Sequence, residues 1–320
     1  MVYRGNYLSN AQRFRLVKVF ALVLGLAFLA ACASMCRGAQ PAAGLFALQQ
    51  PPQPNGTLRI VTEAELRLPA IDGVIIRLHC ADVLDKKGNL NFTWLDGQVS
   101  RVRKTGKKFG LLLMGEDVAK PWLNPFAAKY NRVTQALGNR YPDCVAWFPG
   151  GSISPPRSSE EPHWSNPMPA ECVPAFKRQV DVAVAAFPRA SILWPISAKD
   201  KSGRVQQCAG YLAAMAPGRT MIGHNALKLK DKPPQTAAQW LTAPHNKLAV
   251  SLAKAHRTGV EFEMVDDTRK NHKGSSFPRC GTRNINECIA QAKKLAQLAG
   301  TTDLHVRIYP GDLPKAGGLK

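Results

Sequence analysis

Two glutamates in the segment "GVEFEMVDD", residues 259–267, are the first candidates for chemistry. The apolar start of this segment is typical of a buried strand, and a strand places residues i and i+2 on one face. Glu261 and Glu263 are therefore expected to point the same way. Because a buried carboxylate is costly unless it is paired or hydrogen-bonded, the two should either form ion pairs inside the fold or belong to a catalytic site.

A second acidic pair lies in the segment "GGSISPPRSSEEPHW", where Glu160 and Glu161 precede His163 and Trp164. The polar composition of this segment indicates a loop. The two carboxylates either form a solvated acidic surface or fold over a site together with the neighbouring aromatic side chains. Two further acidic residues, Asp82 and Glu116, directly follow apolar runs.

The elements that would position these residues alternate between short apolar runs and amphipathic helical stretches. The apolar runs cover 57–64, 73–81, 108–115, 144–150, 191–197, 220–227, 259–265 and 304–310. Such alternation favours a parallel sheet with crossover helices, and eight runs is the number of strands in a closed (β/α)8 barrel. An open doubly wound sheet is the alternative, but the sequence holds no glycine-rich phosphate loop to support it.

Residues 68–123 carry a resemblance to a known family. The elements are "DGVIIR", an acidic loop, "GNLNFTWLD", a helix, "GKK", a strand and "PWL". This order resembles the opening of β-galactosidase-like glycoside hydrolases, which are (β/α)8 barrels of a large retaining clan. The resemblance implies an acid/base glutamate after strand 4 and a nucleophilic glutamate at the end of strand 7. It thus implies hydrolysis of O-glycosidic bonds by two carboxylates.

Counting strands assigns these roles to the two acidic pairs. The seventh run contains Glu261 and Glu263, and catalytic residues of a barrel lie at the carboxyl ends of its strands. Glu263 is therefore the expected nucleophile, with Glu261 in reserve. The loop after the fourth run supplies the acid/base, for which Glu161 is preferred over Glu160. Arg77, on the second run, resembles the arginine that keeps the nucleophile ionised in these enzymes.

The same resemblance indicates residues that bind sugar. Asp82 and Glu116 could bind hydroxyl groups, and His163 could line the cleft. Tryptophans stack on the faces of sugar rings or fill hydrophobic cores, and both interpretations stay open here. The candidate platforms are Trp147, Trp164 and Trp194.

One departure from the family concerns the acid/base. The Asn-Glu pair expected at the end of strand 4 is replaced by "FPGG", residues 148–151, and the glutamates come some ten residues later. The alternative to an enzyme is therefore a non-catalytic glycan-binding or structural protein of the cell envelope. A serine hydrolase is a poor fit, because the sequence has no G-x-S-x-G elbow.

The N-terminus predicts export. Basic residues precede the apolar run "VFALVLGLAFLAAC", which is shorter than the roughly 20 residues that span a bilayer. Its end, Leu29 to Cys32, resembles the lipobox of bacterial lipoproteins and implies lipidation of Cys32; ordinary cleavage nearby is the alternative. The expected organisation is a signal peptide at 1–31, a Pro- and Gln-rich tether at 32–56 and a barrel domain at 57–320. Ala33 favours the periplasmic face of the outer membrane.

Cysteines outside the signal and tether number six, and an exported chain can oxidise them. Cys280 with Cys288 is the first candidate disulfide, and Cys144 with Cys172 is the second. No zinc or redox spacing occurs among them, and His79, His224 and His305 lack the spacing of a metal site. Neither a metal nor a cofactor is expected.

The net charge of +21 falls to +17 once the four basic residues of segment 1–31 are removed. For an exported chain, anionic polysaccharides or lipid head groups are better partners for this charge than nucleic acid. A solvated basic surface with no partner is the alternative. The chain is expected to be a monomer that binds carbohydrate.

Overall fold

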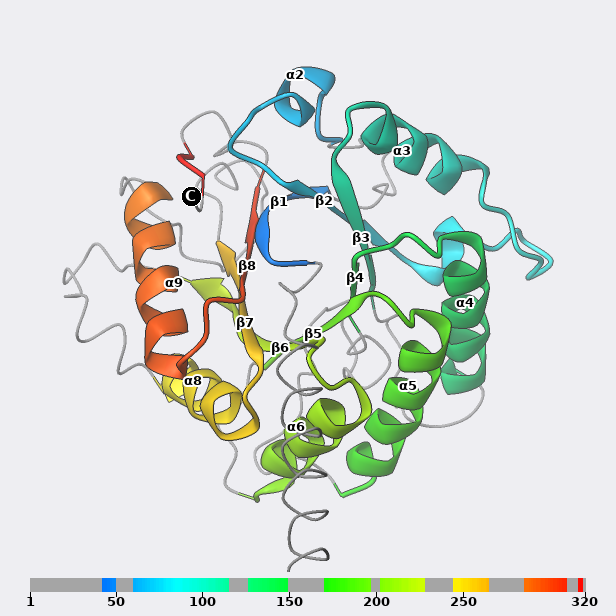
Figure 1. The fold of residues 1–320 in the computed structure, drawn as a ribbon. Coiled ribbons are helices and arrows are strands. Elements are labelled where there is room, and N and C mark those ends of the chain that lie inside the picture. Colours follow the sequence, from blue (N-terminus) through cyan, green and yellow to red (C-terminus); the bar gives the residue numbers. More distant parts are fainter. Residues whose placement is uncertain are drawn as a thin grey trace, which may run out of the picture. The chain divides into compact units, whose positions relative to one another are not determined.

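The computed structural model describes residues 42–49, 60–114, 126–148, 170–196, 202–227, 244–264, 285–309 and 316–318, all within the compact unit Gln40–Lys320. In these ranges, eight parallel strands close into a barrel in chain order, and helices surround it (Figure 1). The predicted (β/α)8 barrel is therefore confirmed.

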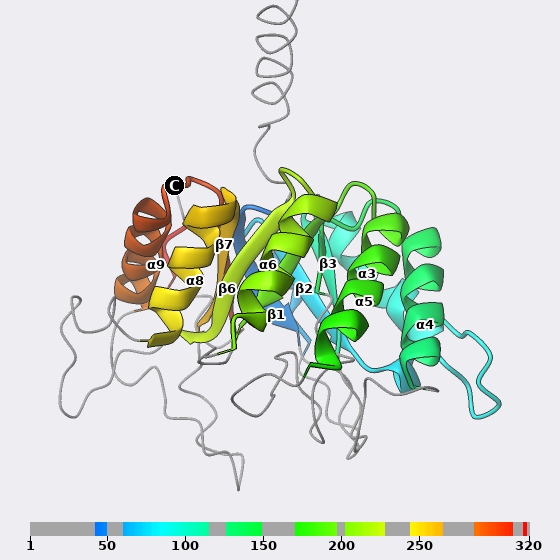
Figure 2. The ribbon, with the colours of Figure 1, turned by 90° about the horizontal axis from the view of Figure 1, so that it is seen from below.

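The strands are β1 Gly44–Gln49, β2 Gly73–Leu78, β3 Lys108–Leu113, β4 Ala146–Trp147, β5 Ser191–Pro195, β6 Thr220–Leu227, β7 Gly259–Met264 and β8 Leu304–Ile308. The helices are α2 Glu63–Leu66, η1 Cys80–Asp82, α3 Thr93–Lys104, α4 Phe126–Arg140, α5 Cys172–Ala186, α6 Arg204–Met215, α8 Pro244–His256 and α9 Ile285–Ala299. Helices α4, α5, α6, α8 and α9 lie side by side along the outside of the strands (Figure 2). Seven of the eight apolar runs coincide with strands.

The first strand corrects the sequence prediction. Strand β1 covers Gly44–Gln49, inside the expected tether, and pairs with both β2 and β8. The run 57–64, expected to be the first strand, instead leads into helix α2. The side chain of Thr62 accepts a hydrogen bond from the backbone N–H of Glu65, and the Glu65 carboxylate accepts one from the backbone N–H of Thr62. This capping box starts a helix, so the barrel domain begins before residue 57.

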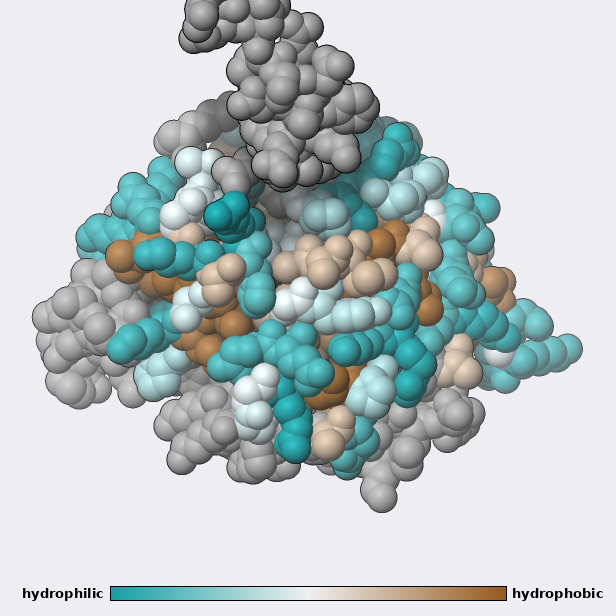
Figure 3. All heavy atoms as spheres, turned by 60° about the horizontal axis from the view of Figure 1, so that its bottom comes forward, coloured by the Kyte–Doolittle hydropathy of each residue, from teal (hydrophilic) through white to brown (hydrophobic). Residues whose placement is uncertain are grey.

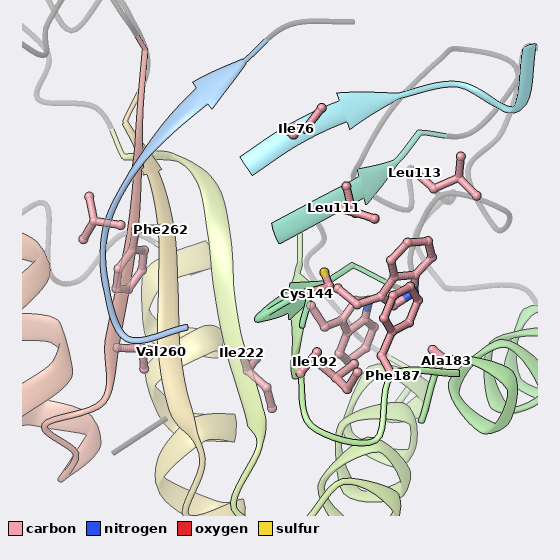
Figure 4. Close-up of a cluster of buried hydrophobic side chains, with 14 of the residues drawn as sticks. Ile76, Leu111, Leu113, Cys144, Ala183, Phe187, Ile192, Ile222, Val260 and Phe262 are labelled. Atoms are coloured by element: carbon pink, nitrogen blue, oxygen red, sulfur yellow. The ribbon is translucent and has the colours of Figure 1, made fainter. Parts of the chain in front are cut away.

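The core has two hydrophobic layers. The outer layer lies between the barrel strands and the helices, and the inner layer fills the barrel interior. Strand side chains alternate between these layers, because successive residues of a strand point to opposite faces. Val260 and Phe262 lie in the outer cluster, together with Ala183 of α5 and the neighbouring Phe187 (Figure 4). The inner cluster includes Phe46, Leu48, Ile75, Leu112, Phe148, Leu193 and Met221.

On the face that Figure 3 shows, hydrophobic residues lie among many hydrophilic ones. In the described ranges, the exposed large hydrophobic residues are Leu90, Met215 and Leu298, which belong to three different parts of the chain. Among these same residues, no helix has both the length and the apolar composition that crossing a bilayer requires.

Candidate active site

Strand β7 aims both of its glutamates into the barrel. Val260 and Phe262 occupy the outer cluster (Figure 4), so the alternating Glu261 and Glu263 face inward. Their exposed fractions are 0% and 5%. The inward direction predicted from their spacing is therefore found, and Glu263 lies nearer the carboxyl end of the strand.

The Glu263 carboxylate is held on both oxygens. Arg77 Nη2 donates to Glu263 Oε2 at 3.0 Å, and Arg307 Nη1 lies 3.4 Å from the same oxygen. Tyr309 Oη donates to Glu263 Oε1 at 2.5 Å. Two guanidinium groups and a phenol therefore surround one carboxylate. Opposite charges and donated hydrogen bonds both favour its ionised form.

Arg77 and Tyr309 also bind each other. Arg77 Nη1 donates to Tyr309 Oη at 3.2 Å, and the Arg77 Cζ atom lies 5.6 Å from the centre of the tyrosine ring. Arg77 comes from β2, whereas Tyr309 directly follows β8. The β1 strand lies between these two strands in the barrel. Strand β1, which the sequence prediction placed at 57–64, therefore sets the distance between two strands whose side chains bind Glu263.

Glu261 makes a separate ion pair at the other end of the Arg307 guanidinium. Arg307 Nη2 donates to Glu261 Oε2 at 3.1 Å, and both side chains are fully buried. Burial raises the pKa of Glu261, and the Arg307 charge opposes this rise. The other carboxylate oxygen, Glu261 Oε1, has no hydrogen-bond partner among the described residues.

His305 lies next to Glu261 on the neighbouring strand, since the two residues are paired in the β7–β8 register. Its Nδ1 atom lies 2.6 Å from the Ala42 carbonyl oxygen, and its ring packs 4.6 Å from the ring of Phe46. Burial lowers the pKa of His305 to about 3, and the nearby Arg307 adds to this effect. The imidazole is therefore neutral at ordinary pH, with Nδ1 as the donor.

Room for the Glu261 side chain comes from Gly223 on β6. A Cβ atom at this position would lie 1.5 Å from the Glu261 carbonyl oxygen and 2.8 Å from its Cγ atom. Only glycine lets the two strands and the glutamate side chain approach this closely.

The arrangement is suited to nucleophilic chemistry at Glu263. A carboxylate that guanidinium and phenol donors fix in orientation at the carboxyl end of a barrel strand is suited to act as a nucleophile or a general base. Glu261 is enclosed beneath it and has no exposed surface. Among the described residues, no group of three or more His, Cys, Asp or Glu side chains could hold a metal ion.

The two described tryptophans correct the sequence prediction. Trp147 and Trp194 are fully buried in the outer cluster and do not face the barrel mouth. The Trp147 ring stacks on Phe187 with centroids 4.4 Å apart, and Trp194 packs on Phe176 at 4.6 Å. Successive residues of a strand point to opposite faces. Phe148 and Leu193 point into the barrel, so the adjacent Trp147 and Trp194 point towards the helices. They are core residues and cannot stack on a ligand.

Asp82 follows β2 and folds back on its own chain. Its Oδ2 atom accepts a hydrogen bond from the backbone N–H of His79 at 2.7 Å. Burial raises the pKa of this carboxyl group despite that hydrogen bond. Its predicted contact with a sugar hydroxyl stays a prediction. The other predicted site residues lie outside the described residues: Glu116, Glu160, Glu161, His163 and Trp164.

The disulfide predictions have different outcomes. Cys144 and Cys172 are both free thiols in this structure, so the pairing predicted for them is wrong. Burial raises the pKa of each thiol to about 12, and Cys144 Sγ donates to the Ala146 carbonyl oxygen. Cys280 and the lipidation candidate Cys32 lie outside the described residues. The Cys280–Cys288 pairing and the lipidation of Cys32 therefore stay predictions.

Arg307 and Tyr309 were not predicted as site residues. A signal for them was present in "LHVRIY", residues 304–309, because His305, Arg307 and Tyr309 alternate with apolar residues. In a barrel strand this alternation puts all three on the inner face. Pairing the seventh and eighth runs would have brought them next to the glutamates.

No protein-family model and no curated protein sequence matches this chain. Among solved structures, it is similar to ZgEngAGH5_4 in complex with a cellotriose, with a TM-score of 0.55, 10% identity, and coverage of 88% of this chain and 92% of the other. It is also similar to a GH5-4 broad specificity endoglucanase from an uncultured bacterium, with a TM-score of 0.50, 11% identity and 78% coverage of both chains. The chain therefore has the (β/α)8-barrel fold of these glycoside hydrolase structures.

Proposed function

We propose that the protein is a retaining glycoside hydrolase in which Glu263 is the nucleophile. The observation that carries the proposal is the placement of Glu263 between Arg77, Arg307 and Tyr309 at the carboxyl end of β7. This set of donors fixes the carboxylate in one orientation and keeps it charged, as attack on an anomeric carbon requires.

The proposed reaction has two displacements. Glu263 attacks the anomeric carbon while the bond to the leaving oxygen breaks, and that oxygen takes a proton from Glu161. A water molecule then attacks the same carbon, gives its proton to Glu161 and releases Glu263. Glu160 is the alternative acid/base, and both residues lie in the sequence between β4 and α5.

A β-linked glucan is the proposed substrate class. The support is the fold shared with the endoglucanase and with the protein solved with cellotriose. Glu116, His163 and Trp164 are proposed to line the cleft with Asp82. Trp147 and Trp194 are not part of this proposal, because they pack behind the strands.

We further propose that a lipid on Cys32 holds the enzyme at the periplasmic face of the outer membrane. Strand β1 starts at Gly44, so the chain between this lipid and the barrel is shorter than the tether predicted from composition. At about 3.5 Å per residue, twelve residues reach about 40 Å at most. The substrate would then be an oligo- or polysaccharide of the cell envelope.

Trapping the covalent intermediate tests the nucleophile directly. The purified protein is incubated with a 2-deoxy-2-fluoro glucoside or cellobioside that carries a good leaving group, and the labelled peptide is located by mass spectrometry. A label on Glu263 supports the proposal, whereas a label on Glu261 or another carboxylate contradicts the assignment. Glu263→Gln should take no label. Glu287→Gln, on the exposed surface of α9, is the matched control and should label normally.

The acid/base is tested by the dependence on the leaving group. With Glu161→Gln, hydrolysis of an aryl glycoside with a poor leaving group should fall much more than that of a dinitrophenyl glycoside, because the latter needs no protonation. Equal losses on both substrates would exclude Glu161, and the same experiment on Glu160→Gln tests the alternative.

A non-catalytic glycan-binding protein is the second candidate function. The observation that favours it is the saturation of both Glu263 oxygens by buried donors, which is also what a structural ion pair would show. Calorimetric titration with cello-oligosaccharides distinguishes the two functions. Binding without turnover or trapping supports the second candidate.

A further inference from the structure

Arg307 is shared between the two glutamates of β7. Its Nη2 atom donates to Glu261 Oε2 at 3.1 Å, while its Nη1 atom lies 3.4 Å from Glu263 Oε2. Glu263 lies two residues further along the strand, which is about 7 Å at the usual rise per residue. The guanidinium therefore spans the gap between a fully buried carboxylate and the one at the carboxyl end.

Glu261 has no place among the reacting groups of the proposed mechanism. It has no exposed surface, and it lies nearer the amino end of β7 than Glu263. Even so, the barrel accommodates a charged side chain here, with Gly223 leaving room for it on β6. A buried carboxylate is costly unless it is paired or hydrogen-bonded, and among the described residues Glu261 is paired with Arg307.

Arg307 itself is fixed by more than the two carboxylates. Its Cζ atom lies 4.7 Å from the centre of the Phe148 ring, which packs against it from the end of β4. The planar fork of an arginine can bind one carboxylate with each terminal nitrogen in a set geometry. A lysine could not hold the two glutamates in the same way.

We propose that Glu261 is a positioning residue, which orients Arg307 and, through it, fixes and charge-balances the carboxylate of Glu263. The inference rests on the proposed function, since it assigns Glu261 to the same site. It also distinguishes the two glutamates of the segment "GVEFEMVDD": one reacts, and the other sets the orientation and charge of its neighbour.

The charged and titratable groups around the pair come from three strands and from Tyr309. Among the described residues, Glu263 faces Arg77 of β2, Arg307 of β8, Tyr309 and Glu261 of its own strand. Glu261 faces Arg307 and the neutral His305. Strand β6 presents Gly223 at the position beside Glu261 and adds no charge there.

Two substitutions separate orientation from charge in this arrangement. Glu261→Gln removes the carboxyl group that orients Arg307, so Glu263 should lose part of its fixed geometry. Arg307→Gln removes a positive charge beside Glu263, so Glu263 should become ionised only at a higher pH. A nearby charge shifts a carboxyl titration by about 1–3 pH units.

The test compares Glu261→Gln, Glu261→Asp and Arg307→Gln in the full chain. In Glu261→Gln, kcat on an aryl glycoside should fall while KM stays nearly unchanged, because Arg307 is no longer oriented. In Arg307→Gln the acidic limb of the kcat/KM profile should move to higher pH by about one unit or more. Glu261→Asp keeps a carboxyl group and should recover most of kcat. A kcat in Glu261→Gln equal to that of the wild type, or a limb that does not move in Arg307→Gln, would overturn the inference.

A second measurement does not depend on activity. In protein carrying ¹³C at the glutamate side-chain carboxyl groups, the Glu263 signal is assigned from Glu263→Gln and followed during a pH titration. A changed Glu263 chemical shift in Glu261→Gln, together with a titration displaced to higher pH in Arg307→Gln, supports the coupling, and an unchanged Glu263 signal in either variant overturns it. An inactive wild type that shows both changes would overturn the proposed function and leave the coupling in place. Circular dichroism confirms that each variant is folded.

Discussion

The outer and inner faces of the barrel strands differ in the polarity of their buried side chains. In the described strands the outer face is mostly apolar and packs against the helices, with Trp147 and Trp194 among its largest members. The inner face is mostly apolar over β3 to β5, where Leu112, Phe148 and Leu193 belong to one cluster. Its other side carries the buried charges of β2, β7 and β8.

The outer face therefore stabilises the fold through hydrophobic packing, whereas the inner face holds the charged side chains of the candidate site. Replacing buried ion pairs by hydrophobic groups of the same shape is often neutral or stabilising. Charges inside the wall are therefore not explained by stability. Their concentration around Glu263 is better explained by a requirement of the site.

The largest expected effect is on the inner face. Arg307→Met leaves the Glu261 carboxylate buried without its ion-pair partner, which should lower the free energy of unfolding by about 3–5 kcal/mol. Urea denaturation followed by circular dichroism measures the change. The double variant Arg307→Met with Glu261→Gln should recover part of the loss. No recovery would show that packing, not the unpaired charge, causes it.

On the outer face, Trp147→Ala removes a ring that stacks on Phe187 and should cost about 3 kcal/mol or more through the cavity it leaves. Trp147→Phe is the control and should cost less, because an aromatic ring remains. At a temperature where both variants are folded, affinity for cello-oligosaccharides should be unchanged. Loss of affinity at constant fold would contradict the assignment of Trp147 to the core.

Tyr309→Phe removes a single hydroxyl group that donates to Glu263. A hydrogen bond to a charged group contributes about 1.5–3 kcal/mol, so a loss of stability in this range is expected, together with reduced kcat. Tyr130→Phe is the matched control, because its hydroxyl donates to a neutral carbonyl, that of Leu113. Its loss should be about 1 kcal/mol with kcat unchanged. Equal losses of stability and activity in both variants would remove Tyr309 from the site.

The pH dependence of stability should also distinguish Glu261. Burial raises its folded-state pKa above the unfolded value, so its contribution to stability is fully present below the unfolded value and is lost as the pH rises through the folded one. Glu261→Gln lacks this titration. The stability of the wild type relative to this variant should therefore decrease from about pH 4 towards neutral pH. A difference that is constant or grows with pH would contradict the raised pKa.

The smallest effect is expected at the solvent-exposed surface. Arg103 and Asp143 form an ion pair, and their side chains are 45% and 48% exposed. Arg103→Gln should change the free energy of unfolding by less than about 1 kcal/mol, and added salt should reduce the difference. Arg178→Gln, an exposed position on α5, is the control. A loss as large as that of Tyr309→Phe would contradict the contrast between surface and interior charges.

The direction of a strand side chain could be predicted from the sequence where polar and apolar residues alternate, but not where the strand is apolar throughout. The spacing of Glu261 and Glu263 predicted their shared direction, and the resemblance to retaining glycoside hydrolases indicated Arg77 as a residue of the same site. The phase of Trp147 and Trp194 could not be derived in this way, because both faces of these parallel strands are buried and their apolar runs lack alternation. The side that each ring takes depends on packing against α5.

Strand β1 was missed for a related reason. "GLFALQ" lies beside a Pro- and Gln-rich stretch, and the composition of that stretch indicates a tether, although the six residues of "GLFALQ" form a strand. The capping signal at Thr62 and Glu65 was available in the sequence and would have excluded 57–64 as a strand. Recognising it would have left only the earlier apolar run to complete the barrel.

The position of β1 has a consequence for the order in which the molecule can assemble. The first strand pairs with the last, Gly44 with His305, and Ala42 accepts the hydrogen bond from the His305 ring across 263 residues of sequence. During synthesis the barrel should therefore stay open until β8 has emerged. Until then, β1 and β7, the two strands that pair with β8, each have an unpaired edge. Since Arg307 and Tyr309 lie on and just after that last strand, the Glu263 site should be completed in the same step that closes the barrel. Acquisition of activity and loss of the exposed edges should then occur together during refolding.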